Sequence, residues 1–351
     1  CFLYNMKILI TGVAGFIGSH LAEKILKTNY KRNVQVIGVD NLNDYYSPKR
    51  KEANVSILNR YSNFTFIKED VVKSQVINEY KPDIVIHLAS MAGVRYSLEN
   101  PIYYAKNNIL SQINLLEQCV QSNITNFIYA SSSSVYGLNK KIPFTETDPI
   151  DKCNSPYATS KLAMENYAQL YHQLYGISTI GLRFFTVYGP RGRPDMAPYK
   201  FLKAIHNGEE ITKFGDGTSM RDYTYIDDIV GGILGAIHKL IGDRLISENK
   251  TYNVMENPLC EVYNLGNNTP IQLNTFISIC EDVVNKKAKI KLCSKQKGDV
   301  PVTYANIDKA KRDLNYNPST SINEGLKKTY KWFKSFYSSF TMTQRTPFSE
   351  H

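Results

Sequence analysis

The chain has 351 residues, 42% of them hydrophobic, which is enough for a sizeable core in one or two domains. No apolar run approaches the ~18 residues that a membrane span needs, and the six cysteines form no CxxC pair, so we expect neither a disulfide framework nor a metal site. The net charge of +10 is spread along the chain. We therefore interpret it as a solvated surface suited to polyanionic small molecules, not as a nucleic-acid interface.

The first five residues lack the charged region that begins a signal peptide, and we interpret Met6 as the natural start. We accordingly expect a cytoplasmic protein whose cysteines are reduced thiols.

Short apolar runs alternate with helical patterns along the first half of the chain. They are Lys7–Ile10, Val34–Val39, Phe64–Lys68, Ile84–Leu88, Phe127–Ser131 and Thr179–Phe184. Strands that alternate with helices predict an α/β fold with a doubly wound parallel sheet. In such a fold the ligand crevice lies at the carboxyl ends of the strands.

From about Gly189 the sequence becomes richer in Pro, Gly and charge, which predicts a second, smaller lobe. We expect a dinucleotide-binding domain at 6–188 plus roughly 225–262, a smaller lobe at 189–224 plus roughly 263–335, and a tail at 336–351 without clear periodicity. The polar, Asn-rich segment 242–259 predicts a surface loop. Apolar stripes over 102–120 and on the helix from Tyr157 favour packing in the core.

The segment GVAGFIG, from Gly12 to Gly18, stands between the first strand and an amphipathic helix. In a dinucleotide-binding turn, Gly12 permits the turn and Gly15 lets phosphates approach the main chain. Gly18 then lets helix and strand pack closely, and the helix N-terminus offers free N–H groups to the anion. This segment predicts a pyrophosphate site, although a simple glycine turn is the alternative.

Asp40 ends the second strand, where a carboxylate can accept hydrogen bonds from an adenosine ribose. Asn41 follows in place of an arginine, so a 2′-phosphate would meet repulsion without an adjacent cation, which favours NAD over NADP. Asp70 with Val71 and His87 with Leu88 and Ala89 end the next strands, where the adenine and ribose would lie.

The segment YATSK places Tyr157 and Lys161 one helical turn apart behind Pro156, a favourable first residue for a helix. The pKa of a free tyrosine is ~10. We expect Lys161 and the positive nicotinamide ring to lower it, so that Tyr157 acts as a general base while hydride leaves to the ring. Lys161 would also hold the nicotinamide ribose.

In this order, GVAGFIG, Asp40, SSSSVYG, YATSK, RFFTVYGP and RDYTYIDD resemble the extended short-chain dehydrogenase/reductase family, specifically its nucleotide-sugar epimerases. The resemblance covers about 6–333. It implies a Rossmann-type domain, bound NAD, a UDP-sugar substrate and a homodimer formed through two helices. A non-catalytic NAD-binding or RNA-binding member of the fold is the alternative, but such proteins tend to lose the Tyr or Lys.

The resemblance also implies roles for individual residues. Ser132 would bond the reacting sugar oxygen beside Tyr157, Arg221 and Asp299 would contact the uridine diphosphate, and Phe214 and Gly215 would line the uracil pocket. Further cofactor contacts are expected at Phe16, Ile17, Ala92, Asn108, Ser131, Phe184 and Val187.

The segments AGVRYSLENP, with Arg95, and GPRGRPDMA, with Arg193, resemble the UDP-glucuronate 4-epimerases. Thr186 stands where UDP-glucose epimerases usually have Asn, and Thr186, Arg193 and Ser132–Ser134 could donate to a C5 carboxylate. Ser134 also replaces the Glu typical of decarboxylases and dehydratases. We therefore expect reversible 4-epimerisation of UDP-glucuronate to UDP-galacturonate. The alternatives are UDP-glucose or UDP-N-acetylglucosamine 4-epimerisation and, less favoured, decarboxylation. Arg193 could instead bind a phosphate, and Gln296, where UDP-glucose epimerases often have Arg, leaves the phosphate contacts open.

Overall fold

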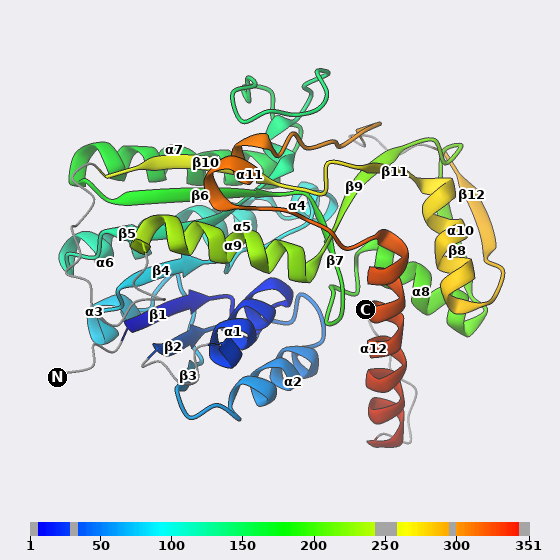
Figure 1. Ribbon diagram of the computed structural model, residues 1–351, viewed down its shortest axis with the longest axis horizontal. Coiled ribbons are helices and arrows are strands. Elements are labelled where there is room, and N and C mark those ends of the chain that lie inside the picture. The colour runs from blue at the N-terminus through cyan, green and yellow to red at the C-terminus, as the bar shows by residue number, and fades with distance from the viewer. Residues whose placement is uncertain (1–5, 29–33, 243–257, 295–299, 344–351) are drawn as a thin grey trace.

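The computed structural model describes residues 6–28, 34–242, 258–294 and 300–343, with side chains up to residue 337. Its centre is a seven-stranded sheet in the order β10-β6-β5-β4-β1-β2-β3 (Figure 1). All its neighbouring strands are parallel. The strands are β1 (Met6–Thr11), β2 (Val34–Val39), β3 (Phe64–Ile67), β4 (Ile84–His87), β5 (Asn126–Ser132), β6 (Ser178–Phe184) and β10 (Cys260–Leu265). The predicted fold class and the six predicted strands are confirmed.

Helices cover both faces of this sheet, because its strands present apolar side chains on alternate sides. On β1, Ile8 and Ile10 pack in one core with α1 (Phe16–Thr28) and α9 (Ile226–Ile241). Leu9 packs in a second core with α3 (Val76–Tyr80), α6 (Ser111–Gln121) and α7 (Pro156–Tyr175). This two-sided burial is typical of a doubly wound sheet.

Two smaller sheets lie beyond the carboxyl ends of the large one (Figure 1). One contains β7 (Thr186–Tyr188), β9 (Met220–Tyr225) and β11 (Pro270–Gln272), and the other pairs β8 (Glu210–Phe214) with β12 (Lys289–Cys293). The helices α8 (Ala197–Asn207), α10 (Leu273–Val284) and α12 (Ile322–Thr343) pack beside them, and α11 (Asp308–Leu314) returns to α9. The remaining helices are α2 (Pro48–Leu58), α4 (Val94–Glu99) and α5 (Pro101–Tyr104).

The helix expected over 102–120 is interrupted. A wide π-helical segment, η1 (Ala105–Leu110), joins α5 to α6. Of the apolar stripes expected to pack in the core, Leu116 is buried, but Ile102 is 82% exposed and Leu174 is 61% exposed. Core packing was therefore the wrong expectation for the outer part of these stripes, because α5 and α7 turn them away from the sheet.

The chain end differs from expectation as well, since helix α12 runs through Ser335 to Thr343. Phe336 stacks on Trp332, one helical turn earlier, at a centroid distance of 5.1 Å. This aromatic packing extends the helix into the segment expected to be a tail without periodicity. The expected loop at 242–259 lies almost wholly outside the described residues. Among the described helices, none combines the length and apolar character that crossing a membrane requires.

Candidate active site

A cavity of about 490 Å³ opens at the carboxyl ends of the central strands. Most of the residues singled out from the sequence line it: Gly12, Gly15, Phe16, Ile17, Gly18, Asp40, Asn41, Asp70, Val71, Leu88, Ala89, Ala92, Arg95, Ser131, Ser132, Ser133, Ser134, Tyr157, Lys161, Phe184, Thr186, Val187, Arg193 and Arg221. Segments far apart in the sequence thus meet around one space. Asn108, Phe214 and Gly215 are not part of its lining, and Asp299 lies outside the described residues.

The glycine loop joins β1 to α1 at the floor of the cavity. Gly12 has φ +69°, and a side chain there would place its Cβ 2.7 Å from the backbone nitrogen of Ala89. A Cβ on Gly18 would collide with the carbonyl oxygen of Gly12. The first N–H groups of α1 have no acceptor within the helix, so this turn presents donors suited to an anion such as a pyrophosphate.

Asp40 ends β2 beside this loop, and its carboxylate is held by two backbone N–H groups. Oδ1 accepts from Leu42 at 2.9 Å and Oδ2 from Ala14 at 3.2 Å. Burial raises the pKa of Asp40, and these two hydrogen bonds partly oppose the rise. A carboxylate oriented in this way retains acceptor capacity for ribose hydroxyls.

A lysine that the sequence analysis missed lies next to Asp40. The buried Lys51, on α2, lines the cavity and donates from Nζ to the backbone and side-chain oxygens of Asn43, both at 2.7 Å. Burial lowers the pKa of Lys51, whereas the charge of Asp40 raises it. Asn41 leaves Asp40 without a cation at the next position in the sequence, but α2 places Lys51 close enough to interact electrostatically with Asp40. Lys51 is eleven residues after Asp40 in the sequence, and it is the position of α2 in the fold that places its ammonium group near the end of β2.

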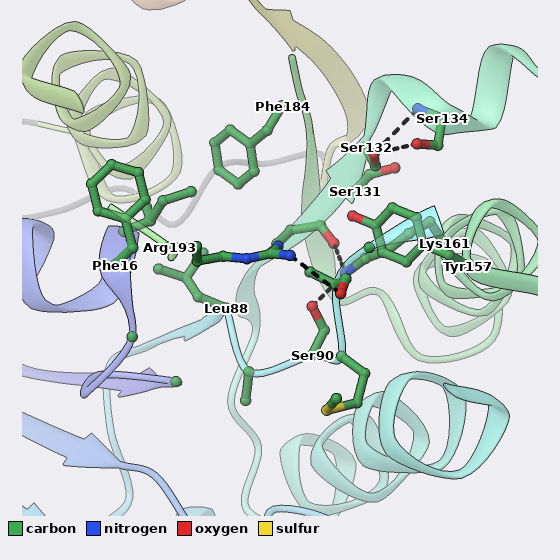
Figure 2. A pocket seen from close by; sticks show the side chains of 18 of the residues that line it. Phe16, Leu88, Ser90, Ser131, Ser132, Ser134, Tyr157, Lys161, Phe184 and Arg193 are labelled. Carbon is green, nitrogen blue, oxygen red and sulfur yellow. Dashed lines mark hydrogen bonds between the residues drawn. The ribbon is translucent and has the colours of Figure 1, made fainter. Parts of the chain in front are cut away.

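Tyr157 and Lys161 enter the cavity from the first turns of α7. Ser155 caps this helix by accepting from the N–H of Ala158 at 3.1 Å, and Pro156 is its first residue. The Nζ of Lys161 donates to the carbonyl of Ala130 at 2.7 Å and to Ser90 Oγ at 2.9 Å (Figure 2). An ammonium group has three donors, so one remains for a ligand.

The electrostatics of this pair differ from the expectation. Burial raises the pKa of Tyr157, and the Ser132 hydroxyl and the charge of Arg193 lower it in part. Burial also lowers the pKa of Lys161 to about 7. The protein without nucleotide therefore keeps the phenol protonated. The expected lowering of the Tyr157 pKa would have to come from the bound cofactor.

Two buried networks support the catalytic face. Ser131 Oγ donates to Glu165 at 2.5 Å, and Arg183 donates to the same carboxylate from Nε and Nη2 at 2.9 and 2.7 Å. Asn108 bonds both the N–H and the carbonyl of Met91, at 2.7 and 3.0 Å, and donates to Ser160 Oγ at 2.9 Å. Asn108 therefore ties η1 to a loop of the cavity and to α7 without facing the cavity itself.

The opposite wall is built from the substrate candidates. Figure 2 shows the Arg193 side chain pointing toward the part of the cavity where Tyr157 and Lys161 lie. Arg193 forms an ion pair with Asp195, a residue that the sequence analysis did not single out. Arg95 lies with its guanidinium 5.1 Å from the ring centroid of Phe214, so Phe214 supports the lining from behind.

The remaining candidates are the serines at and after the end of β5, Arg221 for the diphosphate and Gly215 for the uracil pocket. Ser132 Oγ accepts from the backbone N–H of Ser134 and bonds its hydroxyl, both at 3.2 Å. Arg221 donates to the carbonyl of Met220 at 2.9 Å and lines the cavity from β9. Gly215 follows β8, and its N–H bonds the carbonyl of Cys293.

The donor set fits a nicotinamide dinucleotide in several respects. Glycine-loop amides suit the diphosphate, Asp40 suits a ribose, and the remaining Lys161 donor suits a second ribose. In the described part of the chain, no group of three His, Cys, Asp or Glu side chains is arranged to hold a metal ion.

Comparison with known proteins identifies relatives over most of the chain. A family model described as GDP-mannose 4,6 dehydratase matches residues 9–329. An uncharacterized protein of Methanocaldococcus jannaschii is 47% identical, over 93% of this chain and 95% of its own. UDP-glucuronate 4-epimerase 4 of Arabidopsis thaliana is 42% identical, over 95% of this chain and 76% of its own.

Solved structures are similar over almost the whole chain. The UDP-glucuronic acid 4-epimerase of Bacillus cereus, in complex with UDP-glucuronic acid and NAD, superposes with a TM-score of 0.84 at 36% identity, covering 95% of this chain and all of that one. The UDP-glucose 4-epimerase of Thermotoga maritima, with UDP-glucose, has a TM-score of 0.81 at 32% identity, with the same coverage.

Proposed function

Because this chain belongs to the GDP-mannose 4,6 dehydratase family, as an NAD-dependent UDP-sugar 4-epimerase, we propose that its substrate is UDP-glucuronate and its product UDP-galacturonate. The observation that carries the proposal is the Arg193 guanidinium, which points into the cavity toward Tyr157. A uronate presents a carboxylate at C5, next to the reacting C4, and a guanidinium N–H can donate a charge-assisted hydrogen bond to it. A neutral hexose offers Arg193 no such partner.

Thr186 supports the same choice. Its side chain lines the cavity at the start of β7, and the serine run Ser132–Ser134 lines the same cavity from the end of β5. A hydroxyl can donate to a carboxylate at this position, whereas the UDP-glucose epimerases usually carry an asparagine there. The Bacillus cereus relative, which binds UDP-glucuronic acid, is slightly more similar to this chain than the relative that binds UDP-glucose.

The chemistry is assigned to three side chains. Tyr157 removes the proton from the C4 hydroxyl, Ser132 bonds the same sugar oxygen, and Lys161 holds a ribose hydroxyl, while the positive nicotinamide ring of bound NAD would favour the phenolate. NAD, held by the glycine loop, Asp40 and Lys161, would supply a hydride acceptor for C4 and a hydride donor to the other face of the sugar. Between the two transfers the sugar is a 4-keto uronate, which must turn over while its diphosphate stays bound.

The site must also prevent loss of carbon dioxide from this intermediate. A carboxylate at C5 is β to the C4 ketone, and the bond to it breaks readily when it aligns with the carbonyl π system. Donors from Arg193 and Thr186 would keep that bond near the carbonyl plane before the ring turns over. Ser134 offers no acid or base near neutral pH, which counts against a decarboxylase and against a dehydratase.

The remaining contacts are proposed from the cavity lining and, for Asp299, Phe214 and Gly215, from the resemblance to the family alone. Asp40, Asn41, Asp70, Val71 and the glycine loop would bind the adenosine diphosphate half of NAD within a domain formed by 6–188 and roughly 225–262. The uridine diphosphate would lie toward Arg221, Asp299 and the Phe214–Gly215 segment, in a lobe formed by 189–224 and roughly 263–335.

The proposal is tested by following purified protein with NAD by NMR, in parallel reactions with UDP-glucuronate, UDP-glucose and UDP-N-acetylglucosamine. We expect UDP-galacturonate to form until equilibrium, with no carbon dioxide released. Turnover of only UDP-glucose or only UDP-N-acetylglucosamine would assign the enzyme to the other epimerases, and a UDP-pentose product would make it a decarboxylase.

A further inference from the structure

The guanidinium of Arg193 is already engaged along one edge. Its Nε donates to Asp195 Oδ1 at 3.0 Å and its Nη2 to Asp195 Oδ2. This is the bidentate geometry that a substrate carboxylate would adopt with Arg193 if Asp195 were absent. Pro194 stands between the two residues and restricts the backbone that joins them. Within the described residues, Nη1 of Arg193 has no hydrogen-bond partner.

Neighbouring groups hold this pair in place. The Tyr45 hydroxyl donates to Asp195 Oδ2 at 3.2 Å, and the Arg193 guanidinium carbon lies 5.6 Å from the centroid of the Tyr45 ring. Nη2 also lies 3.4 Å from the carbonyl of Ala92. Gly93 leaves room for this packing, because a Cβ there would lie 2.9 Å from the Tyr45 hydroxyl.

We infer that Asp195 is a positioning residue that occupies Nε and Nη2 of Arg193 in a bidentate ion pair. The substrate carboxylate is then held only through the remaining N–H of Arg193, and this hydrogen bond breaks when the 4-keto ring turns over. The inference rests on the proposed function, since it requires a uronate. The C5 carboxylate moves with the ring, so a tight grip on it would oppose the turn that epimerisation needs. A carboxylate supplied by the protein weakens that interaction and keeps Arg193 paired when the substrate carboxylate moves away.

The inference predicts an unusual direction for a binding-site variant. Asp195→Asn keeps the size of the side chain but removes the negative charge beside the substrate carboxylate. We expect KM for UDP-glucuronate to fall about fivefold, the scale of one exposed ion pair. We also expect kcat to fall, with reduced nicotinamide accumulating in the steady state because the keto sugar turns slowly. If Asp195 only oriented Arg193, KM would rise instead.

Asp313 provides a matched control away from the cavity. It pairs with Arg312 through Nε at 2.8 Å and Nη2 at 3.3 Å and accepts from the Tyr263 hydroxyl at 3.2 Å, so it has the same three partner types as Asp195. Asp313→Asn should leave KM and kcat unchanged. Asp195→Ser also removes the charge and should repeat the fall in KM, and the unfolding midpoint of each variant reports its folding.

The outcomes separate the two proposals. Failure of the unmodified enzyme to convert UDP-glucuronate overturns the proposed function, and this inference with it. Conversion by the unmodified enzyme, together with an unchanged or raised KM in folded Asp195→Asn and Asp195→Ser, overturns the inference alone. A lowered KM with accumulated reduced nicotinamide in both variants supports it.

Discussion

The hydroxyl of Tyr157 is the single group on which the proposed proton transfer depends. Tyr157→Phe removes it but keeps the ring, which packs edge-on against Tyr104 at a centroid distance of 6.1 Å. We expect kcat to fall by about 10²–10⁴, the usual contribution of a general base, while NAD still binds. Steady-state rates and a fluorescence titration with NAD measure the two effects. Tyr175→Phe, on the exposed end of the same helix, is the control, and a near-normal rate in Tyr157→Phe would contradict the assignment.

Lys161 gives the protein without nucleotide a characteristic dependence on pH. Burial lowers the pKa of Lys161 from 10.5 to about 7. Below pH 7 the folded and unfolded states are both protonated, and the fold bears the full cost of a buried charge. Between pH 7 and 10.5 the folded state binds fewer protons than the unfolded chain, so this contribution to stability improves as pH rises.

The stability of Lys161→Met relative to the unmodified protein should therefore be highest below pH 7, and it should change with pH by several kcal/mol in all, at ~1.4 kcal/mol per pKa unit. This relative stability should fall steadily as the pH rises above 7. Urea unfolding of both proteins across this range measures it. A stability difference that does not change with pH would mean that Lys161 is not neutralised by burial.

The motif residues were predictable because their spacing along the chain encodes their geometry. Gly12 and Tyr157 belong to such local patterns, and both line the cavity. Lys51 and Asp195 were missed, since nothing near them in sequence marks them. Lys51 reaches Asp40 through the packing of α2, and Asp195 matters only because Arg193 lies at the cavity. The direction of the Tyr157 pKa shift could not be predicted either, because it is caused by burial, which is a property of the folded chain.

At the scale of elements, an ion pair joins β6 to α7 beneath the catalytic residues. Arg183 and Glu165 meet at 2.7 Å with side chains only 3% and 7% exposed. Glu165→Gln leaves Arg183 as a buried, uncompensated charge, and we expect the free energy of unfolding to fall by about 3–5 kcal/mol. Denaturant unfolding measures the change.

The control for this variant is an ion pair at the surface. Glu324 and Lys328 are also 2.7 Å apart, but 57% and 47% exposed. Glu324→Gln should cost ~0.5 kcal/mol or less. Equal losses in the two variants would show that burial does not govern the strength of the Arg183–Glu165 pair.

Strands were easier to predict than helices in this chain. A strand buried on both faces is largely apolar, as in Val34–Val39, where Gln35 is the one polar residue and whose bounds match β2. The helical stripe over 102–120 gave the periodicity but not the direction of burial, nor the wide segment η1 that turns Asn108 inward. Both depend on neighbouring elements, whereas α12 passes Ser335 with an aromatic stack within the helix itself, Phe336 on Trp332.

At the scale of the whole molecule, α5, η1 and α7 leave an apolar face uncovered. Ile102, Leu110, Leu170 and Leu174 are exposed on helices that contact one another. We propose that this face joins two copies of the chain in a homodimer, which would hide side chains that a soluble monomer rarely exposes together.

The proposal is tested by replacing Leu170 and Leu174 together with Glu. We expect a monomer by sedimentation, whereas the unmodified chain sediments as a dimer. Leu292→Glu, an exposed position on β12, should leave the dimer intact. A monomeric unmodified chain would contradict the proposal.

The position of β10 in the large sheet has a consequence for how the protein is made. This strand pairs with β6 at the sheet edge, although residues 186–225 form β7, β8 and β9 of the smaller sheets in between. Until residue 265 has left the ribosome, the edge of β6 has no partner. A nascent chain or fragment that stops before Cys260 should therefore present an open strand edge and aggregate, so the cofactor domain is not expected to be obtained by cutting the gene at a domain boundary.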